Sequence, residues 1–166
     1  MTAEQARFLA DIFLEELEME MATTRRVLAA VPNDKGAYSP HPKSKDAFSL
    51  ASHLASADVM FLNGVAALKF GGGAGMPEDV KTPADVVAWY DAHRGPALAK
   101  VKAMSAEQLA TPVDFHGVMN LPAVRFLNLS VRHAVHHRGQ LAAYLRPMGA
   151  KVPSIFGPSA DEERPA

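Results

Sequence analysis

The chain has no cysteine among its 166 residues. Disulfide bonds, thiolate zinc sites, iron–sulfur clusters and cysteine nucleophiles are therefore excluded, and any metal ion must be held by His, Asp or Glu. The sequence also lacks a Gly-x-Ser-x-Gly motif and a His-Glu-x-x-His motif. The absence of these two motifs argues against a serine hydrolase and against a zinc metalloprotease of the His-Glu-x-x-His class. The seven histidines thus become the main candidates for a functional site.

The chain also has little net charge and no long apolar run. Its 17 Lys and Arg against 18 Asp and Glu leave a net charge of −1, so we expect no nucleic-acid partner. Even the apolar stretch 59–70 contains Asn63, Gly64 and Lys69, whereas a membrane-spanning helix needs about 20 apolar residues. We therefore expect no membrane segment. The acidic start is atypical of a signal peptide, which predicts a cytoplasmic protein.

Apolar residues recur at helical spacing in four long segments that Gly- and Pro-containing stretches separate. The predicted elements are long helices at about 3–31, 44–70, 82–104 and 122–148, a short helix at 105–109, and an irregular or weakly extended stretch at 111–120. Gly95-Pro96 is expected to kink or split the third long helix.

This pattern predicts an all-α protein, a four-helix bundle formed by residues 1–166 as a single domain. The tail 153–166 is expected to be loop-like. The glycine-rich run 71–75 lacks the Gly-Lys-Ser/Thr ending of a phosphate-binding loop and follows a helix instead of a strand. We interpret it as a flexible connector.

The strongest chemical signal is a group of three histidines in the last long helix. Residues three or four apart lie on one face of a helix, so His133 can share a metal ion with either His136 or His137. The row through His137 also contains Leu129, Leu141 and Leu145 and is otherwise apolar, whereas the row through His136 is polar. We therefore expect His133 and His137 to face inward and His136 to lie nearer the polar edge.

A third histidine, His53, lies on the apolar side of the second helix and could face the pair. Three imidazoles without a fourth protein ligand are typical of a catalytic metal site, and imidazole binds zinc, nickel, copper and iron alike. The alternative is that these histidines are hydrogen-bonded core residues without a metal.

Other residues give weaker signals. Glu20 falls on the inward side of the first helix and is a candidate to hydrogen-bond a ligand histidine or to act as a general base. His93 shares a stripe with Val86, Tyr90 and Ala97, so a hydrogen bond in the core is its expected role. His41 and His116 lie in loop-like stretches.

Several motifs together resemble a known family. They are Val31-Pro32, Pro40-His41-Pro42-Lys43-Ser44, His53-Leu54, His133-x-x-His136-His137-Arg138-Gly139-Gln140-Leu141, Tyr144-Leu145-Arg146 and Pro153-x-Ile155-Phe156-Gly157-Pro158-Ser159-Ala160-Asp161-Glu162. With these motifs the chain resembles the DinB-like superfamily of bacterial four-helix proteins, which includes the YfiT-like proteins. The most specific parts are the His-His-Arg-Gly-Gln block and the closing Gly-Pro-Ser-Ala-Asp-Glu.

The resemblance implies a divalent metal ion, most often nickel or zinc, held between the second helix and the last long helix. The family's ligand positions are matched by His53, His133 and His137. The resemblance also implies homodimers and, among characterised relatives, thiol S-transferases and isomerases that use bacillithiol or mycothiol.

Two classes of function follow from these observations. The first is a metal-dependent enzyme acting on a small molecule, as a transferase that uses a low-molecular-weight thiol or as a hydrolase that uses bound hydroxide. The second is a non-catalytic bundle in which the metal ion links two helices. A further protein ligand that closes the site would favour the second class.

Overall fold

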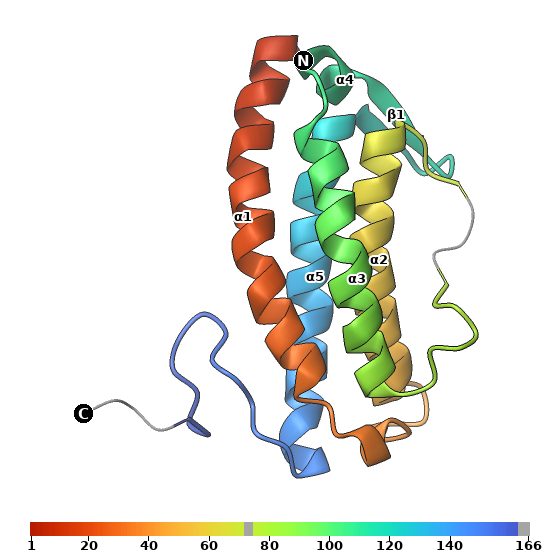
Figure 1. The fold of residues 1–166 in the computed structure, drawn as a ribbon, viewed down its shortest axis with the longest axis vertical. Coiled ribbons are helices and arrows are strands. Elements are labelled where there is room, and N and C mark those ends of the chain that lie inside the picture. Colours follow the sequence, from red (N-terminus) through yellow and green to blue (C-terminus); the bar gives the residue numbers. More distant parts are fainter. Residues whose placement is uncertain (72–74, 163–166) are drawn as a thin grey trace.

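The computed structural model of the protein describes residues 1–71 and 75–162. Its elements are the long helices α1 (Ala3–Ala29), α2 (Ala47–Ala67), α3 (Pro83–Lys102) and α5 (Ala123–Leu145), the short helix α4 (Ala106–Ala110), and the strands β1 (Pro112–Phe115) and β2 (Met119–Pro122). The prediction of an all-α four-helix bundle is confirmed (Figure 1).

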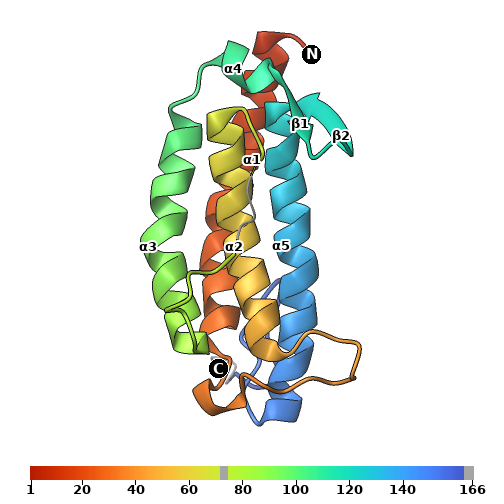
Figure 2. The same cartoon turned by 90° about the vertical axis from the view of Figure 1, so that its right-hand side faces the viewer.

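The four long helices run along the longest axis of the molecule (Figures 1 and 2). Helix α1 packs against α3 and α5, and α2 packs against the same two helices from the other side. The chain start, α4 and the β1–β2 hairpin lie at one end of the bundle, and the α1–α2 loop and the tail lie at the other. Helices α2 and α5 are therefore neighbours along their length, which brings His53 next to the last long helix.

Short polar side chains start most of these helices. Thr2, Asp46, Thr82 and Ser105 each accept a hydrogen bond from a backbone N–H in the first turn of the following helix. Such caps satisfy donors that have no partner within the helix. The helix starts are thus fixed by local sequence, within a few residues of where they are predicted.

Helix α3 runs unbroken through Pro96, so the expected split is wrong. Pro96 and Ala92 both lie on the exposed face of the helix. The carbonyl group of Ala92, which loses its helical partner at Pro96, can therefore be hydrated.

The stretch 111–120 forms more structure than predicted, because it contributes to an antiparallel hairpin in which Val113 pairs with Leu121. The three-residue turn 116–118 places His116 and Gly117 at φ 54° and 71°, and the N–H of Val118 donates to the carbonyl oxygen of Phe115 at 3.0 Å. Val113 is buried and fixes the hairpin to the end of the core.

Two expectations fall partly outside the described residues. In the run 71–75, residues 72–74 are not described, and the same holds for residues 163–166 of the tail. The tail from 153 to 162 contains no helix or strand, as predicted. Within the described residues, no helix combines the length and the apolar character that crossing a membrane requires.

Candidate metal centre

Three histidines meet on the seam between α2 and α5. His53 comes from α2, and His133 and His137 come from successive turns of α5. One ring nitrogen from each lies within 4.8 Å of the other two. The Nε2 atoms of His53 and His137 are 3.2 Å apart, and the ring centroids of His133 and His137 are 4.3 Å apart.

These histidines are half-buried, whereas His136 is exposed. The polar row of α5 is thus on the outside, as predicted. The most buried residues of α5 form a different row, however, which passes through Leu127, Ser130, Ala134, Arg138, Leu141 and Leu145. The histidines therefore lie on the flank of the core, where groups from outside can approach them.

The three imidazoles have lowered pKa values. Burial is the main cause. For His133, electrostatic repulsion from His137 and His53 adds to the effect of burial, and together they lower its pKa to about 4. Burial also lowers the pKa of His53 and of His137. All three rings are consequently neutral near pH 7, which is the form that binds a metal ion.

One neighbour orients a ring of this group. Nδ1 of His137 lies 2.8 Å from Oε1 of Gln140, so the ring donates its N–H to the amide oxygen. This bond leaves Nε2 of His137 with a free lone pair toward the other two rings. Gln140 follows His137 by three residues on α5, and this spacing is the signal in the sequence that indicates the contact.

The donor set fits a divalent metal ion. Two neutral imidazoles at 3.2 Å whose nitrogens both carry lone pairs repel each other unless a proton or a cation lies between them. Three neutral nitrogens, with no carboxylate from the described residues in the group, suit zinc or nickel and leave open coordination positions.

The other histidines do not join this group. His93 is exposed, so the expected place in the core is wrong. Its ring stacks on Trp89 at 4.5 Å, and its Nδ1 donates to the carbonyl oxygen of Trp89 at 2.7 Å. The next residue, Arg94, occupies the core instead. His41 and His116 are exposed loop residues.

Glu20 is not a partner of the histidines, in contrast to the sequence-based expectation. Its carboxylate accepts a hydrogen bond from Arg138, which is 1% exposed. The same Arg138 nitrogen also lies 3.3 Å from Oγ1 of Thr24. This ion pair joins α1 to α5, whereas the histidines join α2 to α5. The sequence correctly placed Glu20 on the inward side of the first helix. Which residue it meets there, Arg138 and not a histidine, depends on how α1 packs against α5.

A buried polar network in the centre of the bundle was not foreseen. Asp58 of α2 accepts hydrogen bonds from Tyr90 at 2.8 Å, from Arg94 at 2.7 Å and from Ser130 at 3.0 Å. Arg94 also donates to the carbonyl oxygen of Leu17 at 3.1 Å. Burial, and next the Asp58 charge, raise the pKa of Tyr90, so its hydroxyl stays protonated. The network connects all four long helices.

The sequence profile of the DinB family matches residues 6–164. The uncharacterized protein YrdA of Bacillus subtilis (strain 168) is 29% identical over 89 residues, which are 51% of this chain and 53% of YrdA. The chain thus aligns with about half the length of that curated relative.

Solved structures have the same fold. A DinB-like protein from Bacillus cereus ATCC 10987 superposes with a TM-score of 0.74 at 23% identity, covering 87% of this chain and 95% of that one. The DinB-like protein YjoA of Bacillus subtilis superposes with a TM-score of 0.70 at 20% identity, covering 91% of this chain and 99% of YjoA. A mycothiol-dependent maleylpyruvate isomerase superposes with a TM-score of 0.55 at 17% identity, covering 80% of this chain and 60% of the isomerase. With the four-helix fold, the three clustered histidines and the profile match over most of its length, the chain belongs to the DinB family.

Proposed function

We propose that the protein is a metal-dependent enzyme that acts on a small molecule and uses a low-molecular-weight thiol as cosubstrate. The convergence of three imidazole nitrogens, which no carboxylate of residues 1–71 and 75–162 joins, carries this proposal. Three protein ligands leave positions for substrate, which is typical of catalytic metal sites. The similarity to a mycothiol-dependent isomerase supports the choice of a thiol, and the absence of cysteine means that the thiol comes from outside the chain.

His53, His133 and His137 would hold the ion, which we expect to be nickel or zinc. When bound, such an ion lowers the pKa of a coordinated thiol or water and so supplies a nucleophile near neutral pH. The chain keeps the three rings neutral by burying them and orients His137 through Gln140. Because the rings are half-buried on the flank of the core, a small molecule can reach them from outside.

Metal analysis tests the site. Protein stripped with chelator and reloaded with nickel or zinc should bind one ion per chain, and alanine at His53, His133 or His137 should abolish this stoichiometric binding. His136→Ala is the matched control, because His136 is an exposed neighbour on the same helix. It should retain the ion. A full equivalent of metal in any of the three triad variants would contradict the assignment.

Spectroscopy tests the chemistry. Bacillithiol, mycothiol or a simpler thiol should change the absorption spectrum of the cobalt-substituted protein, and the loaded protein should accelerate conjugation of that thiol to an electrophile. Turnover of esters or amides without any effect of thiols would instead establish the hydrolase alternative. No effect of thiols or small anions on the spectrum would favour the non-catalytic metal-binding bundle.

The homodimer implied by the family resemblance stays a prediction. Phe8, Ile12 and Met19 are exposed at helical spacing on α1, which supports a further apolar contact there. Light scattering should report about twice the chain mass of 17.8 kDa, and a mass of one chain at working concentration would reject the dimer.

A further inference from the structure

A cavity of about 390 Å³ lies on the outer face of α2, separate from the histidine triad. Its apolar lining includes Val59, Met60, Phe70 and Trp89. We propose that this cavity binds a flat apolar group, such as an aromatic ring, of a substrate whose reacting end lies at the triad. The inference rests on the proposed function and deepens it by naming the class of substrate.

The cavity wall is fixed by the way α2 ends. Leu68 adopts a left-handed conformation with φ 53°, which turns the chain back over the helix. The N–H of Lys69 then donates to the carbonyl oxygen of Gly64 at 3.0 Å. Phe70 packs directly on Gly64, where an added Cβ atom would lie only 2.2 Å from Cε1 of the ring. Glycine at position 64 is therefore required for the Phe70 wall to close against α2.

The cavity and the triad are adjacent along α2. Ser56 and Met60, which line the cavity, follow His53 by one and two turns on nearly the same side of the helix. With a rise of 1.5 Å per residue, these positions are roughly 5 and 10 Å from His53 along the helix axis. A molecule of modest length can therefore span the two sites.

Aromatic contacts also connect the cavity wall to the triad, independently of the spacing along α2. The ring of Phe61 lies 5.5 Å from the ring of His133 and 6.1 Å from the ring of Phe70, measured between centroids. Phe70 thus belongs both to the cavity wall and to the aromatic cluster that borders the triad. Planar faces and edges at this spacing favour flat apolar groups.

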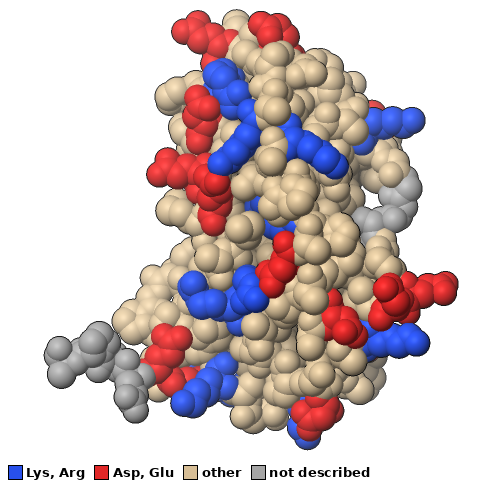
Figure 3. All heavy atoms as spheres, viewed as in Figure 1, with Lys and Arg blue, Asp and Glu red and all other residues tan. Residues whose placement is uncertain are grey.

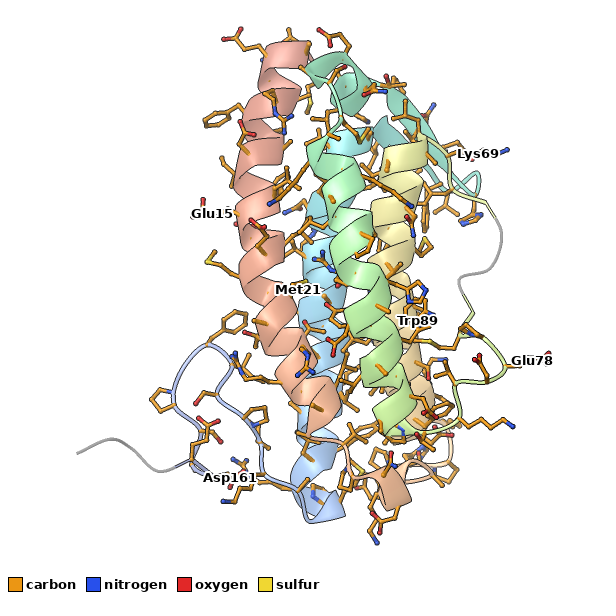
Figure 4. All side chains as sticks on the ribbon, viewed as in Figure 1. Glu15, Met21, Lys69, Glu78, Trp89 and Asp161 are labelled. Carbon is orange, nitrogen blue, oxygen red and sulfur yellow. The ribbon has the colours of Figure 1, made fainter. Side chains whose placement is uncertain are left out.

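Trp89 forms the opposite side of the cavity. Figure 4 shows it on the flank of α3 next to α2, and its stacking on His93 holds the ring in place. Lys69 also borders the cavity, but its side chain extends away from the bundle in Figure 4. The uncharged polar side chains of the lining are Ser56 and Asn63. Such a lining, mostly apolar with few polar groups, is typical of small-molecule pockets.

The single tryptophan of the chain makes the cavity directly observable. In metal-free protein, 8-anilinonaphthalene-1-sulfonate should bind at one saturable site and quench Trp89 by energy transfer. Ala67 lines the cavity and ends α2 on the surface, so Ala67→Phe should fill the space and weaken binding at least tenfold. Ala29→Phe is the matched control, because Ala29 is the exposed last residue of α1, and it should bind like the wild type. Unchanged binding by Ala67→Phe, or binding without quenching of Trp89, would overturn the proposal.

A thiol with a phenyl group tests the connection to the triad. 4-Phenylbutane-1-thiol should displace the dye at least tenfold more effectively from the metal-loaded wild type than from metal-free protein, because one molecule then occupies both sites. The gain should vanish in Ala67→Phe and in His133→Ala. If 2-mercaptoethanol changes the cobalt spectrum but the phenyl thiol shows no such gain, the inference fails and the proposed function stands. If no thiol changes the spectrum, the proposed function fails, and dye binding at Trp89 still decides whether the cavity takes an aromatic ring.

Discussion

Two polar clusters of this bundle, one in its core and one on the flank of the core, differ in how their hydrogen-bonding groups are satisfied. The Asp58 network is buried and joins opposite charges, with Asp58 against Arg94 and hydroxyl donors around the carboxylate. The histidine triad is half-buried and contains three groups of the same kind. Asp58 acts on the triad as well, since its charge raises the pKa of His133 against the larger effect of burial.

The difference separates a cluster whose carboxylate is satisfied within the chain from the cluster that we propose for chemistry. A buried carboxylate that receives donors from several helices has its hydrogen-bonding needs met within the chain. In the triad His137 donates its Nδ1–H to Gln140, so the lone pair of its Nε2 is directed at Nε2 of His53, 3.2 Å away. A cation from outside would bind this lone pair. On the face of the molecule seen in Figure 3, positive and negative side chains are interspersed.

The largest expected effect comes from breaking the structural cluster. Asp58→Ala leaves the buried guanidinium of Arg94 without its carboxylate, which should lower the free energy of unfolding by about 3–5 kcal/mol. Urea denaturation of the metal-free protein measures this change. Asp91→Ala is the matched control, because the Arg25–Asp91 pair is exposed and should contribute at most about 1 kcal/mol. Equal losses in the two variants would show that the Asp58 network contributes no more than a surface ion pair.

A smaller effect is expected from loosening the triad. Gln140→Ala removes the acceptor that orients His137 and should weaken metal binding roughly 10- to 100-fold. The stability of the metal-free protein should hardly change, because Gln140 is exposed. Titration with a competing chelator measures the affinity. Gln140→Glu retains an acceptor and should retain most of the affinity; a loss equal to that in Gln140→Ala would argue against the orienting role.

The smallest effect concerns the pH dependence of the metal-free protein. The pKa of His133 is about 4 in the folded protein against an ordinary value of 6.5, so between these values the unfolded chain takes up a proton that the folded chain does not. Stability due to this group is therefore complete above pH 6.5 and is lost as the pH falls toward 4. Between about pH 6.5 and 5.5 the loss should be about 1 kcal/mol.

Thermal unfolding of His133→Leu provides the comparison for this pH effect. The variant lacks the titrating ring, so its stability should decline less than that of the wild type over the same pH range. Parallel pH profiles for the two proteins would mean that His133 is not the source of the decline.

The sequence predicted the helices well because their signals are local. Apolar spacing and capping residues such as Thr82 act within a few positions, so the starts and ends of the long helices follow from neighbouring residues. At Pro96 these rules predicted a kink or a split, and the helix is not split there, because the affected carbonyl group of Ala92 lies on the exposed face. The same rules failed to identify the hairpin, because pairing of Val113 with Leu121 depends on residues that are not neighbours.

The candidate site was predictable for a related reason. His133 and His137 belong to one helix, and their spacing together with an apolar row was enough to single them out. That His53 faces them follows from the packing of α2 against α5, which the family resemblance implied and the tertiary structure provides.

By itself, then, the sequence determined the helical class, the absence of thiol ligands and the pair of histidines on one helical face. Only the tertiary structure decided which partners the buried charges have: Asp58 with Arg94, and Glu20 with Arg138 in place of a histidine. It also decided that Phe70 folds back on Gly64 to wall a cavity beside the triad. The physical reason is that helical periodicity fixes the direction in which a side chain points, whereas the group it meets there depends on how separate helices pack.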